Sequence, residues 1–172
     1  MPETTTLPSL PELGARVGAR LRERGDTVAV SESSAGGLVS AALLAVPGAS
    51  AYFKGGAVVY SRRAGRALLG MTATDMEGLR AETEPYARLV AGKIKDSHHA
   101  TWGISESGAA GPSGSPYGDP AGRACLAVVG GAAHSRVVET GLTDRPTNMD
   151  LFARHLLALL DEVLDATPQS AV

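Results

Sequence analysis

The stretch Thr27-Val28-Ala29-Val30-Ser31-Glu32-Ser33-Ser34-Ala35-Gly36-Gly37 decides the fold class of this chain. Its first five residues are rich in β-branched and apolar side chains, which predicts a short strand. The run from Glu32 to Gly37 predicts a loop, and residues 38–46 predict a helix that Pro47 and Gly48 end. A strand, a glycine-containing turn and a helix make up the first half of a βαβ unit, so we expect an α/β domain.

Periodic segments on both sides extend this pattern. Apolar residues at helical spacing predict helices near 13–21, 63–69, 85–97 and 148–164, and β-rich runs predict strands over 55–60, 101–107, 123–129 and 135–140. A Gly-Gly-Ala-Ala turn joins the last two strands, which should form an antiparallel hairpin. We expect a single three-layer domain with a mixed sheet, helices on both faces and a C-terminal β-hairpin plus helix.

The composition sets the limits of this domain and of its function. We expect the domain over residues 12–165, between a disordered Thr- and Pro-rich lead-in over 1–11 and a disordered tail over 166–172. Apolar residues make up 44% of the 172 residues, enough for a core without disulfides, and the lone Cys125 is expected to be a buried thiol. The net charge is −2 with no basic block, which argues against a nucleic-acid-binding protein.

Membrane, metal and cofactor functions are not expected either. Every apolar run is far shorter than the roughly 20 residues that a membrane span needs, and the N-terminus lacks the pattern of a signal peptide, so we expect a cytoplasmic protein. The four histidines show no metal-ligand spacing, and a cysteine cluster is absent from the sequence. We therefore expect neither a metal site nor a cofactor.

Two Ser- and Gly-rich loops, Ser31 to Gly37 and Ser105 to Gly122, are the candidate site. Each opens with Ser-Glu-Ser at the end of a predicted strand. Ligands of open α/β sheets bind beyond the carboxyl ends of the strands, so both loops can face one crevice. The first loop suits a phosphate or carboxylate, although ordinary helix capping explains it as well. The second is long enough to be either functional or mobile.

Five ordered segments resemble the CinA C-terminal domain family. They are Glu32-Ser33-Ser34-Ala35-Gly36-Gly37, Pro47 to Gly56, Tyr60-Ser61, Ser107-Gly108-Ala109-Ala110-Gly111-Pro112 and Pro120-Ala121-Gly122. The resemblance runs from about Leu13 to Leu160. It implies an α/β domain that hydrolyses nicotinamide mononucleotide to nicotinate mononucleotide and ammonia, in the salvage of pyridine nucleotides. It also implies a small-molecule nucleotide as the partner, and relatives that self-associate, so we expect a homo-oligomer.

The resemblance assigns site residues in this chain. It places the nucleophile on Ser50 and further catalytic roles on Tyr60 and Ser33. It implies substrate binding by a larger set: Gly36, Gly37, Ser107, Gly108, Gly111 and Arg145. For Arg145, phosphate binding and an exposed capping salt bridge are both open.

One catalytic position departs from the family pattern. The family lysine should stand five residues after the tyrosine, where this chain has Gly65, and a serine nucleophile needs a neighbouring base. Arg66 is adjacent but stays protonated. Lys54 could substitute if it faces the same pocket, and the alternative is a solvated surface lysine. Arg62, at the family's asparagine position, and Arg63 could instead add charge that binds phosphate.

These observations leave two hypotheses. In the first, the chain is an amidase that acts on nicotinamide mononucleotide. In the second, it is a catalytically impaired relative that keeps the pocket as a nucleotide-binding or interaction module, because function depends on the site rather than on the fold.

Overall fold

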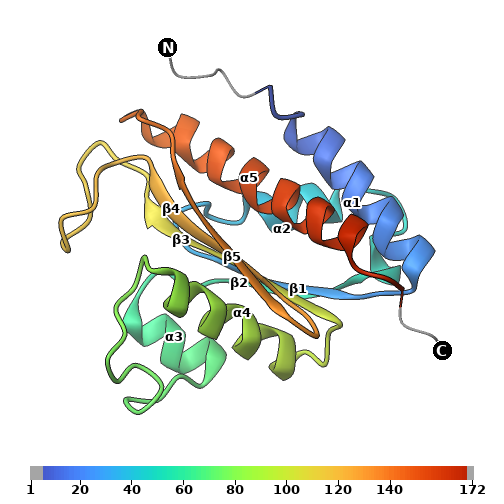
Figure 1. Cartoon of the computed structure of the whole chain (residues 1–172), viewed down its shortest axis with the longest axis horizontal. Helices are drawn as coiled ribbons and strands as arrows, with labels where there is room; N and C mark the ends of the chain where they lie inside the picture. The colour runs from blue at the N-terminus through green and yellow to red at the C-terminus, as the bar shows by residue number, and fades with distance from the viewer. Residues whose placement is uncertain (1–5, 170–172) are drawn as a thin grey trace.

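A five-stranded mixed sheet forms the centre of the computed structural model, which describes residues 6–169 (Figure 1). The strand order is β2-β1-β3-β4-β5. Strand β1 is parallel to β2 and β3, whereas β3, β4 and β5 are successively antiparallel. The strands are β1 (Val28–Glu32), β2 (Phe53–Val58), β3 (Trp102–Ala109), β4 (Arg123–Val129) and β5 (Ala133–Glu139). The expected mixed sheet and C-terminal hairpin are confirmed.

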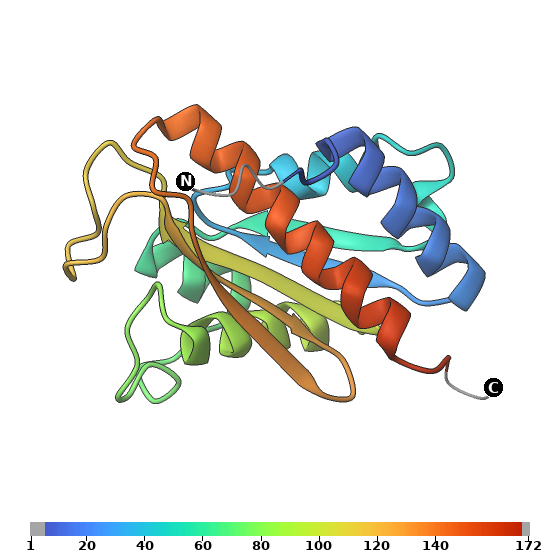
Figure 2. The same ribbon diagram turned by 45° about the horizontal axis from the view of Figure 1, so that its top comes forward.

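Helices cover both faces of this sheet, as expected (Figures 1 and 2). One face carries α1 (Leu10–Arg24), α2 (Leu38–Leu44) and α5 (Arg145–Ala166), and the other carries α3 (Arg62–Leu69) and α4 (Glu84–Ser97). A three-residue 3₁₀ helix, η1 (Ala49–Ala51), precedes β2. Among the helices of residues 6–169, none is both long enough and apolar enough to cross a membrane.

The two faces of the sheet differ in the size of their apolar clusters. The larger apolar core lies under α1, α2 and α5 and includes Leu21, Phe152 and Leu160. Smaller clusters lie under α3 and α4. There, α4 approaches β3 so closely that a Cβ on Gly103 would collide with the Ala91 carbonyl oxygen. The α3/α4 face therefore has the smaller share of the apolar packing, although α4 itself lies close against the sheet.

Element boundaries differ from the expected ones by a few residues. Helix α1 begins at Leu10, because Ser9 and Glu12 form a reciprocal capping box, and it ends at Gly25, whose φ of 68° suits glycine. The last residues of the expected lead-in, Leu10 and Pro11, are therefore helical, and α5 extends to Ala166. Residues 1–5 and 170–172 of the expected lead-in and tail lie outside the described residues.

Candidate functional site

The two Ser-Glu-Ser sequences lie side by side in the sheet. Ser31 of β1 is the register partner of Ser105 of β3, and the two strands run parallel, so Glu32 neighbours Glu106 and Ser33 neighbours Ser107. Both glutamates are almost completely buried. Ser33 of the first loop and Ser107 of the second line the same pocket. The expectation that the two loops face one crevice is confirmed for these two residues.

Glu32 occupies the amino end of α2. Its carboxylate oxygens accept hydrogen bonds from the backbone N–H groups of Gly37 (3.1 Å), Val39 (2.9 Å) and Ser40 (2.9 Å). These donors would otherwise be free to bind an anion. The structure therefore favours capping over phosphate binding for this turn, although Glu32 rather than a serine supplies the cap. Gly36 and Gly37, expected to bind substrate, line neither of the two pockets described below.

Glu106 holds the loop that carries Ser33. Its Oε2 accepts hydrogen bonds from the backbone N–H groups of Ser33 (3.0 Å) and Ala35 (2.8 Å), and its Oε1 accepts one from the Ser34 hydroxyl. Burial raises the pKa of Glu106, while these hydrogen bonds oppose the rise and the nearby Glu32 adds to it. The Ser33 backbone is thus fixed by a side chain from a neighbouring strand.

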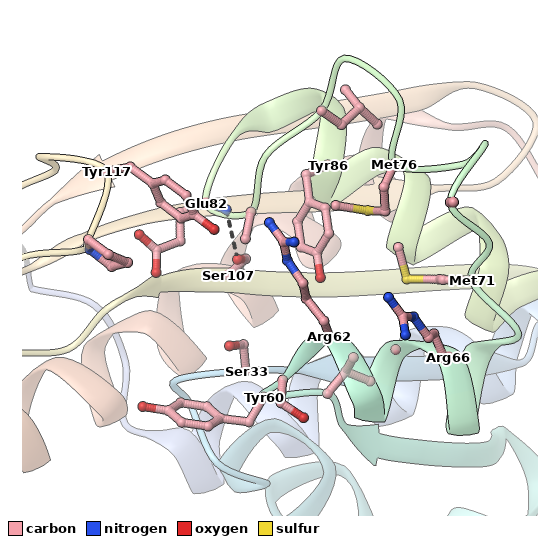
Figure 3. Close-up of a pocket in the computed structure, with 18 of the residues that line it drawn as sticks. Ser33, Tyr60, Arg62, Arg66, Met71, Met76, Glu82, Tyr86, Ser107 and Tyr117 are labelled. Carbon is pink, nitrogen blue, oxygen red and sulfur yellow. Dashed lines mark hydrogen bonds between the residues drawn. The ribbon is translucent and has the colours of Figure 1, made fainter.

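A cavity of about 520 Å³, here called the main pocket, opens at the carboxyl ends of β1, β2 and β3 on the α3/α4 face (Figure 3). Hydroxyl groups line one side of it, from Ser33, Tyr60 and Ser107. The other side is apolar or cationic and is formed mainly by α3, the segment 71–82 and the start of α4, with Arg62, Arg66, Met71, Met76 and Tyr86. Such a mixture of apolar walls and a few polar groups is typical of small-molecule sites.

A second cavity of about 130 Å³, the side pocket, adjoins the main pocket and shares Tyr60 and Glu82 with it. Arg145, the first residue of α5, lines the side pocket and donates hydrogen bonds to the Gly111 carbonyl oxygen (2.7 Å) and to the Tyr60 hydroxyl (3.1 Å). Gly108 lines both pockets and Gly111 lines the side pocket. The residues expected at Tyr60, Ser107, Gly108, Gly111 and Arg145 are therefore brought together.

The long loop after β3 is clamped over the site by an ion pair. Arg80 donates hydrogen bonds to Asp119 at 2.8 and 3.2 Å, and its guanidinium lies 4.8 Å from the centre of the Tyr117 ring. The hydrogen bond from Arg80 lowers the pKa of Asp119 to about 2, with Ser115 and Arg123 adding to the effect. Tyr117 thereby forms part of the main pocket.

Ser50 and Lys54 lie at the opposite end of the sheet from this pocket. Ser50 is exposed in η1, before β2 begins, and Lys54 is an exposed residue near the start of β2. Tyr60 follows the end of β2, and a strand of six residues spans roughly 20 Å. The structure does not bring Ser50 or Lys54 to either pocket, and the position of Lys54 fits the alternative of a solvated surface lysine.

Gly65, by contrast, lines the main pocket directly. A Cβ at this position of α3 would lie 3.2 Å from the Met71 sulfur and 3.8 Å from a methyl carbon of Val59. The position therefore faces the site. Arg62 and Arg66 flank it on the same helix and also line the pocket, whereas Arg63 does not.

Several pocket residues were missed by the sequence reasoning. Glu82, Tyr86, Met71 and Met76 lie on segments to which no motif pointed, whereas Tyr117 lies in the expected second loop but was not singled out there. One available signal was the unpatterned stretch between the predicted helices at 63–69 and 85–97, because connections of this length inside a compact domain are usually functional.

Comparisons with known proteins find relatives both by sequence and by fold. The family model of the CinA C-terminal domain matches residues 11–164. A CinA-like protein of Synechococcus sp. (strain CC9902) is 43% identical over 118 residues, which are 69% of this chain and 28% of that protein. One from Myxococcus xanthus is 36% identical over 149 residues, 86% of this chain and 35% of that protein. The chain thus spans about a third of the length of these curated relatives.

Solved structures match over nearly the whole chain. A Competence-Damaged Protein (CinA) superfamily protein from Klebsiella pneumoniae has a TM-score of 0.87 at 28% identity, covering 93% of this chain and 100% of that one. A CinA superfamily protein from Escherichia coli has a TM-score of 0.83 at 26% identity, with 90% of each chain covered.

Proposed function

Because the chain belongs to the CinA C-terminal domain family, we propose that its main pocket binds nicotinamide mononucleotide and hydrolyses the carboxamide of that nucleotide. The observation that carries the proposal is that Arg62 and Arg66 line the same cavity as Ser33 and Ser107 (Figure 3). A nucleotide of this kind has a phosphate at one end and a carboxamide at the other, and the pocket offers groups suited to both. The role of the protein would be the salvage of a pyridine nucleotide.

The phosphate would bind to the arginines of α3. Arg62 and Arg66 are one helical turn apart, both are exposed, and neither forms an ion pair with any part of the chain that the structure describes. Guanidinium groups form charge-assisted, bidentate hydrogen bonds with phosphate. Two unpaired cations on one rim of the pocket therefore favour a phosphorylated ligand over a neutral one.

The pyridine ring and its carboxamide would lie deeper in the pocket. Met71, Met76 and Tyr86 supply apolar and aromatic surface for a flat ring. The Ser107 hydroxyl oxygen accepts a hydrogen bond from the Glu82 backbone N–H (3.1 Å), so its own hydrogen can be donated to a ligand carbonyl. The Ser33 hydroxyl lies on the same side (Figure 3).

A binding module without turnover is the second candidate, and two observations favour it. Gly65 supplies no amine to the pocket that it lines, and Ser50 lies at the other end of β2. Both candidates predict that the nucleotide binds, and only the first predicts that ammonia is released.

The test measures binding and turnover separately. Calorimetry with nicotinamide mononucleotide should give a Kd that rises roughly tenfold to hundredfold in the Arg62→Gln/Arg66→Gln double variant. The Kd of the dephosphorylated nucleoside should not change, and Arg63→Gln is the matched control. Ammonia release by the unaltered protein decides between amidase and binding module, and Ser50→Ala should retain both binding and turnover. An equal loss for nucleotide and nucleoside would contradict phosphate binding by α3.

A further inference from the structure

Glu82 has a backbone conformation that a side-chain-bearing residue rarely adopts. Its φ is 63°, in the left-handed region. Three contacts hold it there. Its N–H donates to the Ser107 hydroxyl (3.1 Å), and its carbonyl oxygen accepts from Arg123 (3.0 Å) and from the Cys125 thiol (3.4 Å). Conformations of this kind cost free energy and concentrate at functional sites, where the surrounding structure enforces them.

The side chain that this conformation presents belongs to both cavities. Glu82 lines the main pocket and the side pocket, and it lies above Ser107 and Ser33 in the close-up (Figure 3). Its Oε2 is buried and has no hydrogen-bond partner among the described residues. An unsatisfied buried carboxylate oxygen is costly, so its retention at a ligand pocket calls for a reason.

The Glu82 carboxyl group is not needed to anchor the long loop, because Asp119 already anchors it. Asp119 accepts from Arg80 and from the Ser115 hydroxyl (2.7 Å), and these bonds tie the long loop to the segment before α4. Glu82 adds to this network through its backbone carbonyl, which would remain in any residue at this position. The carboxyl group is therefore available for chemistry.

Its surroundings also tune its proton affinity. Burial raises the pKa of Glu82; the Ser115 hydroxyl and Arg80 oppose the rise, and the negative charge of Asp119 adds to it. The other ionisable groups near the carboxyl are Arg123, which donates to the Glu82 carbonyl oxygen, and the pocket residues Arg62, Tyr86 and Tyr117, of which Tyr117 lies beside Glu82 (Figure 3). A carboxyl with a raised pKa is a more effective base than an ordinary one, provided that it is ionised at the working pH.

We propose that Glu82 is the proton-transfer residue of the main pocket and takes the part for which Gly65 offers no base; this assignment rests on the proposed amidase function. The Glu82 carboxylate removes a proton from a water molecule as the water oxygen bonds to the carboxamide carbon. The Ser107 and Ser33 hydroxyls can donate to the oxygen that gains negative charge. The carbon–nitrogen bond then breaks, and the same proton passes from Glu82 to the departing nitrogen. The product carboxyl group gives its remaining proton to ammonia, so nicotinate mononucleotide and ammonium leave, and Glu82 is again a carboxylate.

Kinetics of Glu82→Gln beside Glu77→Gln test the assignment. Glu77 is an exposed residue of the same segment that lines neither pocket, so it controls for the chemical change. Glu82→Gln should lower kcat roughly a hundredfold or more and leave KM within about threefold. In the unaltered protein kcat should rise with pH to a plateau as Glu82 ionises, and Glu82→Gln should lack this rise.

A second variant separates chemistry from folding. Glu82→Gly relieves the positive φ, so it should melt no lower than the unaltered protein and yet lack turnover. Added formate, a small carboxylate, should restore part of its rate.

Each result bears on a distinct claim. If the unaltered protein releases ammonia and Glu82→Gln keeps its kcat, the assignment of Glu82 is overturned and the amidase function stands. If the unaltered protein binds the nucleotide without releasing ammonia, both are overturned and the binding module remains.

Discussion

The Ser34 hydroxyl donates a hydrogen bond to the carboxyl group of Glu106, which stands 72 positions later in the chain. Both side chains are buried. The same carboxyl group accepts the backbone N–H groups of Ser33 and Ala35, so one buried acid fixes three consecutive residues at the edge of the pocket. The position of Ser33 depends on this contact between two neighbouring strands.

Glu106→Gln should change stability in a pH-dependent way. The pKa of Glu106 is raised by folding, so its neutral form is favoured in the folded state. Its contribution is therefore fully present below the unfolded pKa and is lost as the pH rises through the folded pKa. In urea unfolding, the unaltered protein should lose stability relative to Glu106→Gln as the pH rises above the unfolded value of 4.5. Glu23→Gln, at an exposed position of α1, should show no such trend.

Glu106→Ala should be damaging at every pH. It leaves two backbone N–H groups and the Ser34 hydroxyl without their acceptor, which should lower the free energy of unfolding by about 3 kcal/mol or more. A pH-independent difference for Glu106→Gln, or a small effect of Glu106→Ala, would mean that the loop satisfies these donors in another way.

Gly65→Lys should restore turnover in the Glu82→Gln background. Position 65 faces the main pocket, and its helical backbone accepts a side chain if the Met71 sulfur moves by a few tenths of an ångström. A lysine at position 65 would supply a base to the same pocket from a second position. Ammonia release should rise at least roughly tenfold over the Glu82→Gln/Gly65→Met variant, whose unbranched side chain is one atom shorter and lacks the amine. Equal rates in the two double variants would show that position 65 has no access to the reacting group.

Asp119→Asn should loosen the clamp over the pocket. The Arg80–Asp119 pair would lose its charge–charge attraction, and because the Arg80 side chain is 39% exposed the loss of stability should be small and local to the loop. Amide hydrogen exchange over residues 110–121 should become faster, and binding of the nucleotide weaker. Asp96→Asn, at a side chain that is 80% exposed, is the control.

The clamp should also respond to acid. The pKa of Asp119 is lowered to about 2, so its stabilising contribution is present above the unfolded value, near 3.8, and is lost as the pH falls towards 2. Exchange in this loop should accelerate over that range in the unaltered protein and not in Asp119→Asn. The same acceleration in both proteins would assign the acid response to other groups.

The sequence allowed the elements and the sheet edge that carries the site to be predicted. Helical and strand periodicities, together with stop signals such as Gly25, depend on local backbone preferences. They can therefore be recognised from the sequence alone. The repeated Ser-Glu-Ser sequence was informative because parallel strands have their carboxyl ends at the same edge of the sheet. Its two copies are in register at Ser31 and Ser105.

Other parts of the site depend on distant contacts and were not predictable in this way. Ser50 and Tyr60 are ten positions apart in the sequence, but an extended strand places them at opposite ends of the sheet. Glu82 has its unusual backbone because Ser107, Arg123 and Cys125 hold it, and these are residues that no local pattern connects with it. Glu32 and Glu106 are acidic residues that a composition rule would place in solvent.

The sheet separates two halves of the molecule that should tolerate amino-acid substitutions to different degrees. The main pocket is built from strand ends, α3, the segment after it and the start of α4, whereas the larger apolar core lies on the opposite face under α1, α2 and α5. Substitutions that reshape the pocket therefore leave most of the buried apolar contacts untouched. Such a domain can lose one reactive group and acquire another over its evolutionary history without passing through an unfolded intermediate, and combinatorial libraries confined to the α3/α4 face should yield a high proportion of folded proteins.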